Sequence, residues 1–522
     1  MRRSSLLSLS CLAALSASLF ATAAYADSAS CTALMGYAPA GINLKITKAS
    51  YDTARQLQAN PRAPAVTLPP HCHVEGEIDR RTGVDGKSYA LRFAVNLPDN
   101  WNGRYLFQGG GGLNGSLNEP LGNQATGGQS GLARGFAVVS TDSGHQGSGF
   151  DASFLLDQEA AMNFNFLGNM RVTTATKPLV TEYYRKAISR AYFVGCSTGG
   201  REGMIMAQRF PMLFDGIVTG APAIHTDMSN LALRWMNVHW NQAAKRGDDG
   251  LPVPGGTYSA AEQKLIVDGL LQACDTLDGA KDGLIHNVAA CNFDPHVLAC
   301  KAGETANCLS PAKADALALA VAGPVDSRGV QVYSRFQLDT GNDDTSGFQK
   351  GMLAGGSTPP EGPPVATMLE QDVDAEFIAA ANDDRLIANS TSTNLSSFFG
   401  HGGKQLFYHG VSDPWFSAMD TVAYYERMAE ANGGLKTVDS SSRIFLVPGM
   451  GHCQGGDATL DSFDMLTPII DWVENGKAPD SVVSTGASMP GVSRPLCPYP
   501  QHSQYNGSGD INKAENFSCK AP

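Results

Sequence analysis

The chain has 522 residues, of which 43% are hydrophobic and 17% are charged, a composition typical of a globular protein with a large core. Its formal net charge of −12 disfavours a nucleic-acid partner, which would select a basic surface. Beyond the N-terminal segment no apolar run approaches the roughly 18 residues that a membrane span needs, so we expect no transmembrane helix. These properties leave the oligomeric state open.

The first 26 residues have the pattern of an export signal. The positive start MRRSS precedes the apolar stretch LLSLSCLAALSASLFATAA, and Ala24, Tyr25 and Ala26 form an A-x-A cleavage site. The sequence therefore predicts a signal peptide over residues 1–26 and a mature protein that is secreted or periplasmic.

Cys11 lies within that segment, so its removal leaves ten of the eleven cysteines, an even number. In an exported chain this predicts disulfide bonds formed in an oxidising compartment. Ten cysteines allow many pairings, and counting alone does not fix the connectivity.

Strand and helix patterns alternate along the next part of the chain. Residues 27–100 are rich in strand and turn signals. Further strands are expected at 104–107, 136–140, 191–194 and 214–219, and helices at 168–190 and 204–209. Strands that alternate with helices predict an α/β fold, with a parallel sheet covered on both faces.

This alternation stops at about residue 223, in a region rich in Gly, Pro, Asp and Ala that holds four cysteines. Strand signals return at 405–408 and 443–447. A sheet that is interrupted and then resumed predicts an inserted subdomain. We expect core segments at 27–222 and 399–522 and an insertion at 223–398.

The stretch GCSTG, residues 195–199, fits the G-x-S-x-G pattern of a nucleophile elbow. A Gly- and Ser-rich loop can match this pattern by chance, but here it follows a predicted strand and precedes a predicted helix, as the motif requires. Because an elbow displays its central residue, we expect Ser197 to be the nucleophile rather than its neighbour Cys196.

Two further residues, both much later in the chain, complete a catalytic triad in the order Ser, Asp, His. Asp413 follows the strand at 405–408 and His452 follows the strand at 443–447, at the strand ends where open α/β sheets build their sites. Taken alone, Asp413 could be a turn former before proline and His452 a loop histidine. Their order and positions together favour the triad.

Cysteines flank two of these three residues, because Cys196 precedes Ser197 and Cys453 follows His452. If Ser197 and His452 are hydrogen-bonded, their neighbours come within the Cα separation of about 5.5–6 Å that a disulfide needs. We therefore expect a Cys196–Cys453 disulfide that holds the base against the nucleophile.

A serine nucleophile that attacks a carbonyl group also needs two N–H donors for the oxyanion. One is expected from Thr198, the residue after the nucleophile, and the other from Gly110 in the glycine run that follows the strand at 104–107. Glycine lets the backbone approach a substrate closely. The run lacks the G-K-[ST] ending of a phosphate loop, and a plain turn is the remaining alternative.

The sequence resembles the tannase and feruloyl esterase family of secreted α/β-hydrolases over nearly all of the chain outside the insertion. The resemblance rests on WNGRYLFQGGGGLNGS, GCSTGGREGM, QRFPMLFDGIVTGAPA, YHGVSDPWFSAMD, FLVPGMGHC and RPLCPYPQ…GSGDIN. A cysteine beside the serine and another beside the histidine is a specific mark of the family. The resemblance implies an α/β-hydrolase core, stapled by disulfides, with a lid inserted between the nucleophile and acid segments.

Further pairings and a metal site follow only from this resemblance. It implies disulfides Cys31–Cys72, Cys274–Cys291, Cys300–Cys308 and Cys497–Cys519. It also implies structural Ca²⁺ in the lid stretch CDTLDGAKDGL, whose oxygen donors suit a hard cation. The ligands would be carboxylates of Asp275, Asp278 and Asp282 and carbonyls of Ala280 and Leu284. The spacing departs from an EF-hand, and by itself it also fits a solvated acidic turn.

Together these features predict a serine hydrolase of aromatic carboxylic esters, feruloyl esters first and galloyl esters or terephthalate monoesters next. Phe416, close after Asp413, is the expected aromatic wall of the substrate pocket. Family members that cleave terephthalate monoesters have glutamate where this chain has Thr198, and a lid arginine that neither Arg335 nor Arg385 matches. A peptidase and a non-catalytic calcium-binding protein are the competing interpretations.

Overall fold

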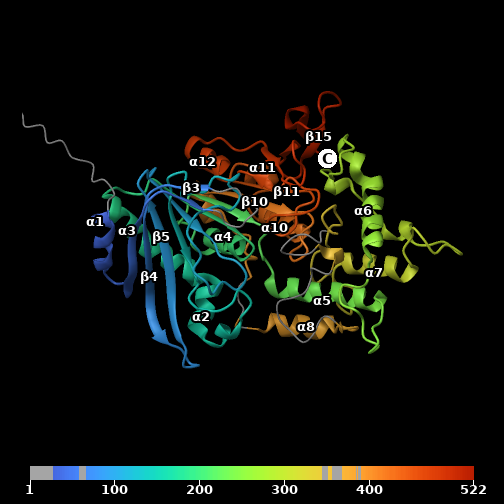
Figure 1. Ribbon diagram of the computed structural model, residues 1–522, viewed down its shortest axis with the longest axis horizontal. Helices are drawn as coiled ribbons and strands as arrows, with labels where there is room; N and C mark the ends of the chain where they lie inside the picture. Colours follow the sequence, from blue (N-terminus) through green and yellow to red (C-terminus); the bar gives the residue numbers. More distant parts are fainter. Residues whose placement is uncertain (1–27, 58–65, 344–350, 355–366, 384, 386–388) are drawn as a thin grey trace, which may run out of the picture.

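A nine-stranded sheet forms the centre of the computed structural model (Figure 1). The structure describes residues 28–57, 66–343, 351–354, 367–383, 385 and 389–522, so the predicted signal peptide lies outside the described residues. The strand order is β1 (Leu44–Asp52), β4 (His71–Thr82), β5 (Ser88–Pro98), β7 (Ala137–Thr141), β6 (Arg104–Gln108), β8 (Arg190–Cys196), β9 (Gly216–Gly220), β10 (Lys404–Gly410) and β11 (Ser442–Val447). In this spatial order, the first four strands, which end with β7, pair antiparallel. The strands from β7 onward pair parallel.

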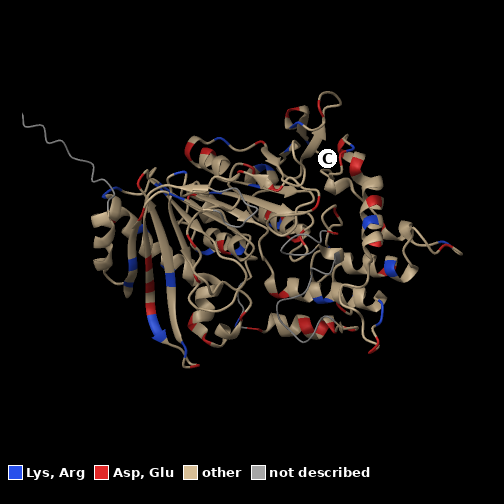
Figure 2. Ribbon diagram, viewed as in Figure 1, with Lys and Arg blue, Asp and Glu red and all other residues tan. Residues whose placement is uncertain are grey.

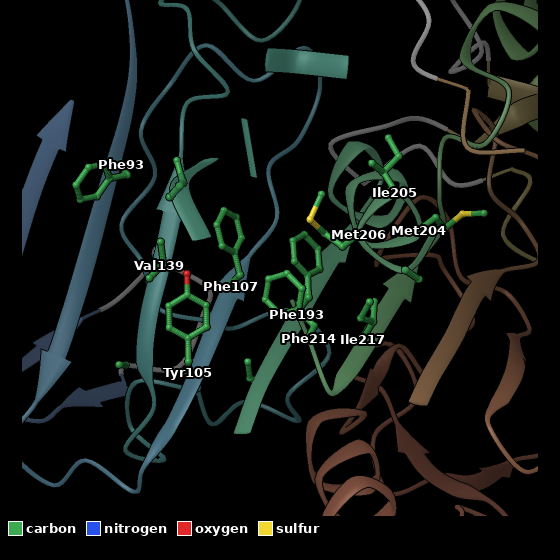
Figure 3. Close-up of a cluster of buried hydrophobic side chains, with 14 of the residues drawn as sticks. Phe93, Tyr105, Phe107, Val139, Phe193, Met204, Ile205, Met206, Phe214 and Ile217 are labelled. Carbon is green, nitrogen blue, oxygen red and sulfur yellow. The ribbon is translucent and has the colours of Figure 1, made fainter. Parts of the chain in front are cut away.

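The parallel part of the sheet, from β7 to β11, is buried on both faces, whereas most residues of the edge strand β1 are exposed or half-buried. Successive side chains of β6 point to opposite faces, so Phe107 joins one core cluster and Leu106 the other. The first cluster, shown in Figure 3, packs against α3, α4 and α10, and the second packs against α12. The bounds are α3 (Gly168–Tyr184), α4 (Thr198–Arg209), α10 (Ala418–Ala431) and α12 (Leu466–Asn475).

The remaining elements are short or belong to the chain between β9 and β10. Short helices are α1 (Ser28–Ala33), α2 (Gln158–Met162), α9 (Ser396–Gly400) and α11 (Leu435–Val438). Small sheets pair β2 (Arg55–Leu57) with β3 (Val66–Leu68), β13 (Val482–Thr485) with β12 (Ser462–Phe463) and β14 (Ser493–Leu496), and β15 (His502–Tyr505) with β16 (Phe517–Lys520).

The chain between β9 and β10 adds no strand to the central sheet within its described residues, and β9 and β10 are direct parallel neighbours. Its longer helices gather beside the sheet (Figure 1) around a third core cluster, which includes Met236, Leu270 and Leu317. They are α5 (Thr226–Ala243), α6 (Ala260–Cys274), α7 (Pro311–Ala322) and α8 (Val373–Ala381).

The five predicted disulfides are all present, with Cα–Cα separations between 4.8 and 6.0 Å. Acidic and basic residues both occur along the whole ribbon (Figure 2). In the described part of the chain, no helix combines the length and apolar character needed to cross a membrane.

One predicted helix is shorter than expected. The sequence predicted a helix over 168–190, but α3 ends at Tyr184 because Arg185 takes a left-handed conformation with φ 49°. β8 then begins at Arg190.

Candidate active site

The strand order reverses beside β8. Because β6 lies between β7 and β8, the chain leaves β6 toward β7 and later returns to β8 on the other side of β6, and open α/β sheets build their sites at such a point. The glycine run follows β6, and Ser197 follows β8. The two loops touch, since the Gly199 N–H donates to the Gly110 carbonyl at 3.1 Å.

Ser197 sits on a sharp turn between β8 and α4. Its φ of 64° and ψ of −126° lie in a region that residues other than glycine rarely adopt. A Cβ at Gly195 would lie 2.5 Å from the Gly199 carbonyl oxygen, and a Cβ at Gly200 would lie 2.3 Å from the Gly220 oxygen. The glycines around the serine therefore permit the turn that displays it.

The predicted acid and base are in contact. The Nδ1 atom of His452 lies 2.7 Å from Oδ2 of Asp413, and both residues are buried. Nε2 of His452 is also buried and has no hydrogen-bond partner among the described residues. An imidazole held by a carboxylate through one nitrogen, with the other nitrogen free, is the arrangement of a general base.

A disulfide joins the neighbours of the predicted nucleophile and the predicted base, with the Cα atoms of Cys196 and Cys453 6.0 Å apart. It brings the loop that carries His452 to the elbow that carries Ser197. The structure therefore gathers the three predicted triad residues at the carboxyl ends of β8, β10 and β11.

Asp413 has a second histidine partner that sequence reasoning missed. Nε2 of His409 lies 3.2 Å from the same Oδ2 atom, while Nδ1 of His409 contacts the Thr421 hydroxyl at 2.8 Å. Burial alone would raise the pKa of Asp413, but the charge of His452 and the hydrogen bonds from both histidines hold that pKa well below its usual range. The Asp413 carboxylate is therefore ionised and held in place by both histidines. The only sequence signal for the contact with His409 was the position of that histidine, four residues before Asp413.

The predicted oxyanion donors are the N–H groups of Thr198 and Gly110, and both stay predictions. In this structure the Gly110 N–H donates to Oε2 of Glu202 at 2.9 Å, which makes the N–H of the neighbouring Gly111 a further candidate. Within the described residues, the N–H groups of Thr198 and Gly111 have no acceptor. Glu202, which sequence reasoning missed, also accepts from Nδ2 of Asn114 at 2.8 Å and so holds the glycine loop against α4.

An apolar pocket opens at Ser197. The Phe416 and Trp415 rings, 5.2 and 5.5 Å from the His452 ring, form one side. The other described lining residues are Gly112, Leu113, Phe150, Leu155, Phe164, Thr198, Arg201, Ala223, Thr226, Asn230 and Leu233. Aromatic and aliphatic walls of this kind suit an aromatic acyl group.

The predicted calcium loop offers the donors that calcium prefers, but the described residues contain no ready cluster of three or more His, Cys, Asp or Glu that could hold a metal ion. Asp275 accepts the N–H groups of Asp282 and Gly283, and Asp282 pairs with Arg494. Asp278 is 1% exposed and accepts backbone N–H groups, with no cationic side chain beside it in the described chain. A buried carboxylate without a counter-charge fits a nearby cation.

The sheet order, the sharp turn at Ser197 after β8 and the contact between Asp413 and His452 after β10 and β11 define an α/β-hydrolase fold. The family model described as tannase and feruloyl esterase matches residues 72–382 and 365–520. The chain therefore belongs to the tannase and feruloyl esterase family, as its sequence motifs predicted.

Individual relatives are hydrolases and esterases by name. A mono(2-hydroxyethyl) terephthalate hydrolase from Piscinibacter sakaiensis is 39% identical over 526 residues, covering 88% of this chain and 86% of the relative. A probable feruloyl esterase B-2 from Aspergillus terreus is 31% identical, covering 81% and 82%. The protein is a carboxylic ester hydrolase, which argues against the non-catalytic interpretation.

Solved structures give the same fold. Feruloyl esterase B from Aspergillus oryzae superposes with a TM-score of 0.77 at 25% identity, covering 94% of this chain and 100% of that one. Tannin acyl hydrolase from Aspergillus niger superposes with a TM-score of 0.74 at 23% identity, covering 95% of each chain.

Proposed function

We propose that this protein is an exported serine esterase that cleaves esters of aromatic carboxylic acids, feruloyl esters first. Ser197 would be the nucleophile, His452 the general base and Asp413 the residue that orients it. The observation that carries the proposal is the 2.7 Å contact between Asp413 and Nδ1 of His452, which leaves Nε2 free beside the elbow that displays Ser197. The predicted export signal supports the exported location.

In the proposed reaction, Oγ of Ser197 attacks the ester carbonyl carbon while His452 takes the proton of the Ser197 hydroxyl. The N–H groups of Thr198 and Gly111 receive the negative charge on the carbonyl oxygen. The alcohol leaves with the proton from His452, and an acyl-enzyme remains. Water, activated by the same histidine, then releases the aromatic acid and restores the serine.

Terephthalate monoesters are a second candidate, favoured by the 39% identity to the mono(2-hydroxyethyl) terephthalate hydrolase. Galloyl esters are the third. The test is a comparison of kcat/KM on methyl ferulate, methyl gallate and mono(2-hydroxyethyl) terephthalate, with a peptide panel alongside. The highest kcat/KM identifies the preferred acyl group, and activity on peptides alone would overturn the proposal.

The Phe416→Ala variant is expected to raise KM for methyl ferulate by about tenfold, because the aromatic acyl group loses a ring contact and buried apolar area. A short aliphatic ester such as ethyl acetate, which does not reach that wall, should show a KM change of less than about twofold. Initial rates over a range of concentrations check this. Equal changes for both esters would place Phe416 outside the substrate pocket.

The lid loop is also proposed to bind structural Ca²⁺ through Asp275, Asp278 and Asp282, with the Ala280 and Leu284 carbonyls. Bound calcium would supply positive charge to buried carboxylates and so brace the lid. Chelation is expected to lower the Tm by roughly 3–8 °C, because the folded state loses a ligand. The Tm should return with Ca²⁺ but not with Mg²⁺. An unchanged Tm, together with no calcium detected by elemental analysis, would contradict the proposal.

A further inference from the structure

A short segment of the chain between β9 and β10 reaches into the catalytic centre. Residues 339–342 are buried between the loop after β10, which carries Asp413, and the loop after β11, which carries His452. The Gly341 N–H donates to the Ser412 hydroxyl at 3.0 Å, and the Thr340 side chain lies at the Ala458 carbonyl. The segment thus touches both loops that supply the acid and the base.

Asp339 is the residue of this segment that joins the two loops through a single atom. Its Oδ2 accepts the N–H of Gly449 at 2.6 Å and the hydroxyl of Ser412 at 3.1 Å. Ser412 directly precedes the acid, and Gly449 stands three residues before the base. Asp339 is 1% exposed, and its Oδ1 has no hydrogen-bond partner in the described part of the chain.

The surrounding backbone leaves little room for another arrangement. A Cβ at Gly341 would lie 2.3 Å from the Gly449 oxygen, and a Cβ at Gly449 would lie 1.9 Å from the Ala458 oxygen. Gly449 also has a φ of 69°, which favours glycine. The segment and the two loops are therefore packed backbone to backbone, and a displacement of one moves the others.

We propose that Asp339 is a positioning residue for the triad, which sets the loop of Asp413 against the loop of His452. The inference rests on the proposed function of those two residues. Backbone bonds from Val411 to Val447 and from Ser412 to Met450 also join the loops, so loss of Asp339 shifts them rather than separating them. A shift near 1 Å in a catalytic geometry can cost about 100-fold in rate.

The test compares Asp339→Ala with Asp339→Asn. The asparagine oxygen can replace Oδ2 and keep both contacts, while its amide takes the place of the partnerless Oδ1. We expect Asp339→Ala to lower kcat by about 30-fold with KM changed less than about twofold, and Asp339→Asn to stay within about threefold of wild type. Ser412→Ala, which removes one of the two contacts, should fall between them.

Asp326→Ala is the matched control. Asp326 is another buried aspartate between β9 and β10, but it accepts from Val330 N–H and from Arg328 and so closes only its own turn. Its loss should lower the Tm and leave kcat within about twofold. If Asp339→Ala keeps the wild-type kcat, or if both alanine variants lose activity in proportion to their Tm, the positioning role is wrong.

A failure of the proposed function would give a different result from a failure of the positioning role. If the proposed function is wrong, wild type and Ser197→Ala would hydrolyse every ester at the same rate, and the rates of the Asp339 variants would then not report on the triad. A wild-type rate that depends on Ser197, combined with an Asp339→Ala variant of unchanged kcat, would overturn the positioning role alone.

Discussion

Replacement of Ser197 by alanine is expected to lower kcat by about 10⁵- to 10⁶-fold on any ester that the wild-type protein cleaves. In the proposed mechanism the acyl-enzyme route starts at the Ser197 hydroxyl, and the neighbouring Thr198 hydroxyl is engaged with the Gly112 carbonyl. KM should change little, because the pocket walls remain. Single-turnover and steady-state hydrolysis of methyl ferulate would measure both constants.

The fold should survive this substitution, since alanine keeps the Cβ that the turn already accommodates. Ser397→Ala, at an exposed serine of α9, provides a control that should retain the wild-type kcat. A Ser197→Ala variant that keeps more than about one hundredth of the wild-type rate would exclude Ser197 as the nucleophile.

Replacement of Asp413 by asparagine is expected to lower kcat by about 10⁴-fold. The carboxylate accepts hydrogen bonds from His452 and His409, and it holds the His452 tautomer whose Nε2 can take a proton. The asparagine amide can donate to Nδ1 instead, which would place the imidazole proton on the wrong nitrogen. The pH dependence of kcat/KM, measured alongside kcat, would show whether the protonation of His452 has changed.

The chain offers a matched control for this experiment. Asp420 on α10 is also buried and lies 2.9 Å from Nδ1 of His225, so it forms an aspartate–histidine pair outside the triad. Asp420→Asn is expected to reduce stability and to leave kcat within a few-fold. Equal losses of kcat in both variants would mean that the effect of Asp413→Asn is structural rather than catalytic.

The main features of this fold could be predicted because they depend on short stretches of sequence. Short apolar runs followed by glycine or a polar residue mark parallel strands and their carboxyl ends, where Ser197, Asp413 and His452 lie. The disulfides followed from flanking positions and from the family resemblance. The contact between Asp413 and His452 agrees with the expected order, since residues after neighbouring strands β10 and β11 meet at one sheet edge.

What escaped prediction depends on contacts between distant side chains. Glu202 engages the Gly110 amide across 92 residues of sequence, so the glycine run alone could not show which N–H groups stay free. The partnership of His409 with Asp413 required the loop geometry after β10. The helices between β9 and β10 were also missed, because Gly and Pro between them masked the signals of α5 to α8.

The Cys196–Cys453 disulfide, with 257 residues of sequence separation, makes the segment between its ends a closed covalent ring. That ring contains everything between β9 and β10 as well as Asp413. A protease that cuts the ring once opens it without producing two separate fragments, so Ser197 and His452 stay on one molecule until a reductant acts. The disulfide thus makes the pairing of the proposed nucleophile and base tolerant of a backbone break in the chain between β9 and β10.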